Sequence, residues 1–306
     1  MALNKLVVRI TDSGEGPVFD RFFAGYDRAF VLPDEKEDRE GFATCLTLNH
    51  GAARTDLERR YGRFREVCMI AEEADGSPVG GANFIALKSE AGEPAAGGGF
   101  GTVTVNLNYV YVDGQSRGRG NLRRLVGAVA EIAAAMFSDG SAPAPALVFI
   151  ELNDPFAMSE EAYRRDTEFT GLDQLDRLRI WTRLGARIVD HDYVQPALSA
   201  EQEPDHSLIY AVIGGDATMS ACLLLGHLRG FFGISVLKGR PLSDDPSARA
   251  QIALLEAACA AGKLIELLDA GPLVARLAAK AGAATSLGAL PRTTREAIRL
   301  QAGLTT

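Results

Sequence analysis

One stretch of the chain, residues 106–133, constrains the fold more than any other. It opens with an alternating run that predicts a β-strand with two faces, Val105, Leu107, Tyr109 and Tyr111 on one and Asn106, Asn108, Val110 and Val112 on the other. Asp113-Gly114 ends this strand, and a basic glycine-rich segment (RGRG, residues 117–120) follows. Apolar residues then recur at helical spacing as far as Ile132. The sequence therefore predicts a strand, a glycine-rich turn and an amphipathic helix in direct succession.

The start of such a helix can bind an anion. Its first backbone amides have no partner within the helix and carry the positive end of the helix dipole, and glycines let an anion approach the backbone closely. Two phosphate-binding motifs are absent, because no GxxxxGK precedes a Ser or Thr and Gly118-x-Gly120 lacks the third glycine of a dinucleotide-binding turn. A plain connection between a strand and a helix, which binds nothing, is the alternative.

The residues around this turn resemble the acetyl-CoA signature of the GNAT superfamily of N-acetyltransferases, R/Q-x-x-G-x-G/A. In the register that starts at Arg117, Val112 and Leu125 match the apolar positions that flank the family motif. A literal match to the motif also starts at Gln115, but in that register neither flanking position is matched. We take the first register, in which Leu122 stands where Gly or Ala is usual. The resemblance implies that the strand backbone binds pantetheine and that the turn binds the pyrophosphate of acetyl-CoA. The implied cofactor-binding residues are Val110, Tyr111, Val112, Arg117, Gly118, Arg119, Gly120, Asn121, Leu122 and Asn153.

Residues 5–215 follow the order of elements expected of a GNAT domain. A first strand precedes two short helices, a hairpin turns at Ala74-Asp75-Gly76-Ser77, and a loop at Ser89–Gly99 leads to the central strand and helix. The strand after the central helix ends at Asn153, which resembles the family asparagine that meets the pantetheine arm and can equally be a turn residue before Pro155. The other predicted strands are Leu6–Ile10, the two arms of Val67–Leu87, Ala146–Leu152, Asp190–Pro196 and Ser207–Gly214.

A second family signature, a helix that ends in aromatic-x-x-Leu-Gly-Phe, is matched by residues 181–186, WTRLGA. In many family members the aromatic residue is a tyrosine that protonates the departing CoA thiolate. Trp181 replaces it here and cannot usefully donate that proton. The preceding segment, Met158–Gln174, makes the spacing from Asn153 longer than usual, and we interpret it as an insertion at the edge of the acceptor site.

Acetyl transfer to an amine needs a base for the amine proton, a donor for the thioester oxygen and a proton for the leaving thiolate. Glu151 is the first candidate for the base, because it lies two residues before Asn153, beside the expected cofactor position. A carboxylate that faces solvent from an edge strand is the alternative. Tyr193, Tyr111 and Tyr109 are candidates for the acid, since a phenol with a pKa of about 10 suits a thiolate, although strand tyrosines are more often core residues.

Composition limits the partners and the compartment. The chain has 306 residues and a net charge of −8, so it lacks the basic footprint of a nucleic-acid or anionic-membrane binder. No apolar run approaches the length of a membrane span, and the apolar run within the first ten residues, MALNKLVVRI, is too short for a signal peptide. The four cysteines show no CxxC and no metal spacing with the histidines, so we expect reduced thiols, no metal and a cytoplasmic location.

We expect an α/β (α+β) protein with a GNAT-like, mixed and mostly antiparallel sheet flanked by helices over residues 1–215, followed by a helical extension over residues 216–306. The expected function is transfer of an acetyl group from acetyl-CoA to a primary amine of a small molecule or peptide. The alternative is a non-catalytic acyl-CoA-binding regulatory or assembly module, which Trp181 and Leu122 would also suit. The apolar stripes of the extension either cap the acetyltransferase core or form a homodimer interface.

Overall fold

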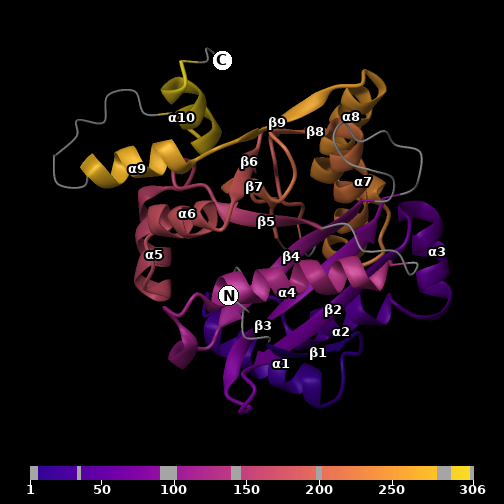
Figure 1. Cartoon of the computed structure of the whole chain (residues 1–306). Coiled ribbons are helices and arrows are strands. Elements are labelled where there is room, and N and C mark those ends of the chain that lie inside the picture. Colours follow the sequence, from indigo (N-terminus) through magenta and orange to yellow (C-terminus); the bar gives the residue numbers. More distant parts are fainter. Residues whose placement is uncertain are drawn as a thin grey trace.

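The computed structural model describes residues 6–32, 36–89, 102–138, 146–197, 202–280 and 291–303 (Figure 1). Within these ranges nine strands form one sheet in the order β1-β2-β3-β4-β5-β7-β6-β9-β8. Neighbouring strands are antiparallel except β4 and β5, which are parallel, so the predicted mixed and mostly antiparallel sheet is confirmed. The strands are β1 (Val7–Thr11), β2 (Phe64–Glu72), β3 (Pro78–Lys88), β4 (Val103–Val112), β5 (Leu147–Asn153), β6 (Ala186–Val189), β7 (Leu208–Ile213), β8 (Thr218–Ser220) and β9 (Leu264–Leu268).

Helices cover both faces of this sheet. One face packs against α4 and α6, whose Leu125 and Leu178 share a core with Val105 and Ile150 of the sheet. The other face packs against α1 and α2 at one end and against α7 at the other. The helices are α1 (Pro17–Ala29), α2 (Arg39–Thr47), α3 (Gly51–Tyr61), α4 (Asn121–Met136), α5 (Glu160–Thr170), α6 (Gln174–Arg183), α7 (Ala221–Phe231), α8 (Pro246–Ala260), α9 (Gly271–Lys280) and α10 (Thr294–Gln301).

The order of elements agrees with the order expected of a GNAT domain, except that three helices instead of two lie between β1 and β2 and that one strand is misplaced. Asp190–Pro196 is not a strand and contributes only the isolated bridge between Gln195 and Asp205. The strand lies earlier, at Ala186–Val189, because Gly185 ends α6 with a φ of 94° and turns the chain directly into the sheet. The predicted loop at Ser89–Gly99 lies, apart from Ser89, outside the described residues.

A β-bulge in β4 changes which side chains share a face. The pairing register with β3 shifts by one residue between Asn106 and Tyr109. Before the bulge, Val105 and Leu107 pack towards α4; after it, Tyr109 and Tyr111 pack towards α1. The prediction that these four residues share one face is therefore wrong, because an extra residue in one strand reverses the alternation beyond it.

β4 and β5 diverge after a short parallel stretch. Their pairing covers only Thr104–Asn106 against Leu147–Phe149. Among the described residues, no strand pairs with the following part of β4, from Leu107 to Val112, on its β5 side. β5 instead continues along β7 as far as Asn153. The sheet is therefore open between β4 and β5, at the level where the glycine-rich turn begins.

The extension after residue 215 provides the predicted helices α7–α10 and also two strands, β8 and β9, which the sequence analysis did not predict. β9 pairs with β6, so the sheet continues into the extension. The apolar sides of α7 and α8 are buried against the sheet, as the capping alternative expects, and the homodimer stays a prediction. No helix in the described ranges is both long and apolar enough to cross a membrane.

The prediction of four reduced thiols is wrong for two of them. Cys222 of α7 and Cys259 of α8 form a disulfide, whereas Cys45 and Cys68 are free and buried. The paired cysteines are 37 residues apart, and only the packing of α8 on α7 brings them together. Their spacing in the sequence carries no sign of this contact.

Candidate active site

One cavity of about 1280 Å³ occupies the opening between β4 and β5. On one face of the sheet it is bounded by the turn before α4, by α5 and by α6. On the other face it is bounded by α1, α2 and the segment after α7. The predicted insertion Met158–Gln174 forms α5 and lines this cavity with Met158, Arg165 and Phe169. The cavity therefore connects the two faces of the sheet through the opening.

Charges of opposite sign line the two parts of the cavity. Apart from Arg28, the arginines belong to the α4 turn, α5 and α6, and we call this part the arginine lobe. Apart from Asp166, which pairs with Arg177, the carboxylates belong to the other part, which we call the carboxylate lobe. The lining arginines are Arg28, Arg117, Arg123, Arg165, Arg177 and Arg183, and the lining carboxylates are Glu37, Glu66, Glu151, Asp166 and Asp205.

The glycine-rich turn leaves the start of α4 open to the arginine lobe. Gly118 and Gly120 have φ angles of 74° and 75°, and Gly120 is an N-cap without a side-chain acceptor. A Cβ added at either glycine would meet nothing within 4 Å, so the left-handed backbone requires glycine there and crowding does not. The Asn121 side chain donates to the Ser116 carbonyl at 2.9 Å and thereby holds the turn. The first amides of α4 are thus available for an anion.

The basic residues near this turn differ in what they contact. Arg117 lines the cavity, whereas Arg119 is exposed and is not among the lining residues. Arg123 lines the cavity and donates to the Arg183 carbonyl at the end of α6, at 2.6 Å. Arg124 pairs with Glu73 and is part of the scaffold. Of these four arginines, Arg117 and Arg123 are the ones that can meet a ligand in the cavity.

The unpaired edge of β4 forms one wall of the opening. Val110, Tyr111 and Val112 line the cavity here, and Asn153 at the end of β5 and Leu122 at the start of α4 do so as well. The side chain of Tyr111 turns away, because its hydroxyl donates to the carbonyl of Phe22 in α1 at 3.2 Å. At this position the backbone of β4, and not the phenol, is directed to the opening.

Glu151 lies on β5 in the carboxylate lobe. Its neighbours on the strand, Ile150 and Leu152, belong to the core on the α4 side, so Glu151 faces the opposite side of the sheet. The Tyr193 hydroxyl donates to its carboxylate, and Asn106 forms a second hydrogen bond with it. Burial raises the pKa of Glu151 from 4.5 to about 7, although both hydrogen bonds lower it. A carboxyl group with a pKa near neutrality can take up and release protons at physiological pH.

The candidate acids lie in different places. Tyr193 is buried, hydrogen-bonded to Glu151 and stacked on Tyr210 with ring centroids 4.5 Å apart, and it is not among the lining residues. Burial raises its pKa well above 10. Trp181 lines the cavity from α6. The structure thus brings Tyr193 and Glu151 together, whereas the hydroxyl of Tyr111 is hydrogen-bonded to α1.

Glu66, the second carboxylate in the middle of the sheet, was not predicted from the sequence. It lies on β2 and is 1% exposed. Its carboxylate accepts hydrogen bonds from the Ser235 hydroxyl at 2.7 Å and from the side-chain amides of Asn83 and Asn108, both at 3.4 Å. Burial raises its pKa from 4.5 to about 7. The available signal was a charged residue inside the apolar strand FREVCMIA, since such residues are rarely buried without a reason.

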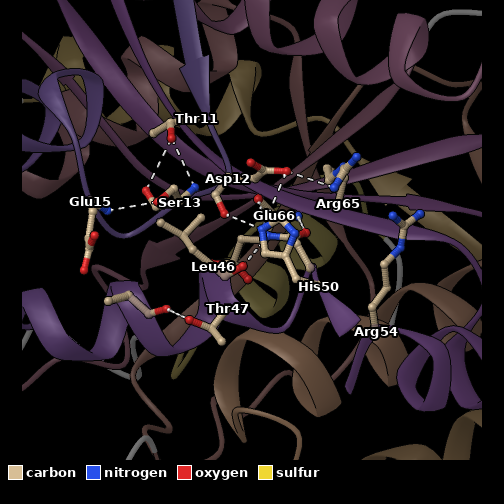
Figure 2. A network of polar contacts seen from close by, with 12 residues as sticks. Thr11, Asp12, Ser13, Glu15, Leu46, Thr47, His50, Arg54, Arg65 and Glu66 are labelled. Carbon is tan, nitrogen blue, oxygen red and sulfur yellow. Dashed lines mark hydrogen bonds and ion pairs between the residues drawn. The ribbon is translucent and has the colours of Figure 1, made fainter. Parts of the chain in front are cut away.

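The backbone of Glu66 is clamped by Asn49. The Glu66 N–H donates to the Asn49 side-chain oxygen at 2.9 Å, and the Asn49 side-chain amide donates to the Glu66 carbonyl at 2.8 Å. Figure 2 shows the polar contacts around this point, including the ion pair in which Arg65 donates to Asp12 at 2.9 Å. These contacts join β2 to α2 and to the end of β1, so the position of Glu66 is fixed from several elements.

A chain of hydrogen bonds runs from α7 to Glu66 across β4. Burial lowers the pKa of His227 to about 3, so this imidazole is neutral and can accept at one nitrogen and donate at the other. Each donor in the chain points towards Glu66. The steps are Thr104 to His227 at 2.9 Å, His227 to Tyr210 at 2.7 Å, Tyr210 to Asn106, Asn106 to Asn108 at 2.9 Å, and Asn108 to Glu66 at 3.4 Å.

No protein-family model and no curated protein matches this chain. Solved structures are similar to it. A protein from Bacteroides thetaiotaomicron assigned to the GNAT family aligns with a TM-score of 0.42 and 14% identity, over 76% of this chain and 99% of its own. A Bacillus subtilis acetyltransferase in complex with CoA aligns with a TM-score of 0.32 and 14% identity, over 69% of this chain and 100% of its own. A GNAT-family N-acetyltransferase from Escherichia coli, also in complex with CoA, aligns with a TM-score of 0.28 and 17% identity, over 70% of this chain and 83% of its own.

Proposed function

We propose that this protein is an acetyl-CoA-dependent N-acetyltransferase that acts on a primary amine of a small molecule or peptide. One observation carries the proposal. A single cavity joins the open N-terminus of α4, the unpaired edge of β4 and the carboxylate of Glu151. These are the three parts that a phosphate-bearing acyl donor and an amine acceptor require.

The arginine lobe suits the anionic end of acetyl-CoA. The amides of residues 121–123 at the start of α4 would bind the pyrophosphate, and the left-handed glycines before them leave room for its approach. Arg117 and Arg123 would add positive charge at the same lobe. The backbone of Val110–Val112 would bind the pantetheine arm in the opening, and its amides would hydrogen-bond the thioester oxygen as negative charge develops there.

Glu151 would act as the base. Acetyl-CoA supplies the acetyl group as an activated thioester. Glu151 takes one proton from the substrate ammonium, and the freed nitrogen lone pair forms the C–N bond as the C–S bond breaks. The nitrogen loses its second proton to solvent in the cavity, and solvent protonates the departing thiolate, so the products are an acetamide and CoA. Tyr193 and Asn106 hold the Glu151 carboxylate in place by their hydrogen bonds.

Neither Tyr111 nor Tyr193 is free to give the thiolate its proton. The hydroxyl of Tyr111 is engaged by the Phe22 carbonyl and that of Tyr193 by Glu151. Trp181 at the usual tyrosine position has no acidic proton of suitable pKa. We therefore assign this proton to solvent in the cavity rather than to Tyr111 or Tyr193.

Two measurements test the proposal. Calorimetric titration with acetyl-CoA, ATP and NAD should show saturable binding of acetyl-CoA alone. CoA release measured with a panel of primary amines should then exceed the background hydrolysis of acetyl-CoA. Glu151→Gln should lose turnover by at least about a hundredfold while it keeps its acetyl-CoA affinity. Glu131→Gln, an exposed change on α4, is the matched control and should leave both unchanged.

One observation favours a second candidate, a non-catalytic acyl-CoA-binding module. It is Trp181, which lines the cavity where many GNAT enzymes have their acid. The same measurements separate the two candidates. Binding of acetyl-CoA without any amine-dependent CoA release would support the module and contradict the enzyme.

A further inference from the structure

The carboxylate lobe has aromatic walls. Phe30, Phe42 and Tyr109 line it, and their ring centroids lie 5.2 Å (Phe30 to Tyr109) and 5.5 Å (Phe42 to Tyr109) apart. Such rings favour contact with methylene chains and with cations, which are attracted to aromatic faces. The lobe therefore offers an apolar path with acidic groups along it.

Glu66 and Glu151 differ from the other shielded carboxylates of the protein. Within the described residues, neither forms an ion pair, and every hydrogen-bond donor to them is neutral. Removing an ionised carboxylate from water costs free energy unless a positive charge compensates it. Elsewhere this balance is present: arginines pair with Glu72 and Asp166, and the first turns of α10 and α8 donate to Asp154 and Asp245.

Among the described residues, Lys238 is the cation whose charge acts on the Glu66 carboxylate, and it is already paired. The Lys238 ammonium lies 2.9 Å from the carboxylate of Glu37 at the rim of the lobe. Glu37 itself lines the cavity, so this pair adds no net charge to the lobe. No ion pair is formed by Glu66 within the described residues, so a cation from outside the protein can pair with it.

The two carboxylates are linked by Asn106 and Asn108. Asn106 hydrogen-bonds Glu151 and donates to Asn108 at 2.9 Å, and Asn108 donates to Glu66 at 3.4 Å. This chain of three hydrogen bonds limits the separation of the two carboxylates to roughly 12 Å. Both side chains lie on the same face of the sheet and line the same cavity. One small molecule can therefore extend from one to the other.

We propose that the acceptor carries two cationic nitrogen groups joined by a flexible aliphatic spacer, one acetylated beside Glu151 and the other held at the Glu66 end of the lobe. This inference rests on the proposed function and narrows its substrate class to α,ω-diamines and their substituted relatives. The spacer lies along Phe30, Phe42 and Tyr109. Glu66 is then a residue that selects the substrate, and Glu151 remains the base.

The test compares diamines with monoamines. Rates of CoA release are measured for α,ω-diaminoalkanes with three to ten carbons and for the monoalkylamines of the same length. The wild type should show a kcat/KM for the best diamine that is at least tenfold above that of the matched monoamine. The advantage should pass through a maximum with chain length, because the two carboxylates fix the distance between the nitrogens. This series needs no variant and remains informative if a variant fails to fold.

Glu66→Gln then identifies the residue responsible. It should lower the diamine advantage towards one, because kcat/KM for the diamines falls to that for the matched monoamines. Glu131→Gln should keep the full advantage. A wild type that shows no diamine advantage at any length, or an advantage that persists in Glu66→Gln, overturns the inference and leaves the proposed function standing. Absence of CoA release with every amine, while acetyl-CoA binds, overturns both.

Discussion

Replacing Glu66 by glutamine should stabilise the protein near neutral pH. The Glu66 carboxyl is 1% exposed, and burial raises its pKa from 4.5 to about 7 even though Ser235 and Asn83 lower it through their hydrogen bonds. Glutamine has nearly the same shape and no charge. The variant therefore removes the cost of ionising a buried group and keeps the packing around it.

The expected gain follows from proton linkage at Glu66. Below pH 4.5 the carboxyl is protonated in both the folded and the unfolded chain, and its stability contribution is complete. Between pH 4.5 and about 7 the unfolded chain loses the proton while the folded chain retains it, so the wild type loses about 1.4 kcal/mol per pH unit. The total loss is on the order of 3 kcal/mol above pH 7. Glutamine does not titrate, so the variant avoids this loss.

The assay is urea unfolding of both proteins at several pH values between about 4.5 and 8. The difference in unfolding free energy between the two proteins removes the contributions of groups that do not interact with residue 66. It should grow with pH up to about 7 and then level off. At low pH, where Glu66 is protonated in both states, the difference in unfolding free energy should be constant. It then reports only the replacement of a carboxylic acid by an amide as the hydrogen-bond partner of Ser235, which is worth about 1 kcal/mol or less. A difference that does not change with pH would refute the reasoning.

Three further changes have expected outcomes. Gly120→Val forces a β-branched residue to a φ of 75°, so it should weaken acetyl-CoA binding in calorimetry at least about tenfold and lower stability by about 1–2 kcal/mol. Tyr193→Phe removes a hydrogen bond that lowers the pKa of Glu151, so the acid limb of the pH profile of kcat/KM should move to higher pH. The double change Cys222→Ser and Cys259→Ser opens a link across 37 residues and should lower the unfolding free energy by about 4 kcal/mol, measured without reductant.

The parts of the fold that depend on local patterns could be predicted from the sequence. The strand, turn and helix of residues 106–133 are found as expected, because glycines with positive φ and helical spacing are properties of neighbouring residues. The bulge in β4 could not be predicted in the same way, since it is defined by the register with β3. It also moved Tyr109 and Tyr111 to the α1 face and so changed which side chains meet the cavity.

The carboxylate lobe shows why the other half of the site could not be read from the sequence. Glu66 is held by Asn49, Asn83, Asn108 and Ser235, which come from four separate segments of the chain. No spacing rule links positions so far apart. A carboxylate inside a largely apolar strand, beside Arg65, was the available sign, and it indicates a buried charge without identifying its partners.

The extension after residue 215 is joined to the site by the same contacts. Ser235 donates to Glu66, His227 begins the hydrogen bonds that orient Asn106, and Lys238 pairs with Glu37 at the rim of the lobe. If the extension were absent, Glu66, Tyr210 and Glu37 would each lose one polar contact. The extension therefore completes the carboxylate lobe. Under the proposed function, the choice of acceptor would therefore depend on the extension, whereas the arginine lobe is built from residues before 215.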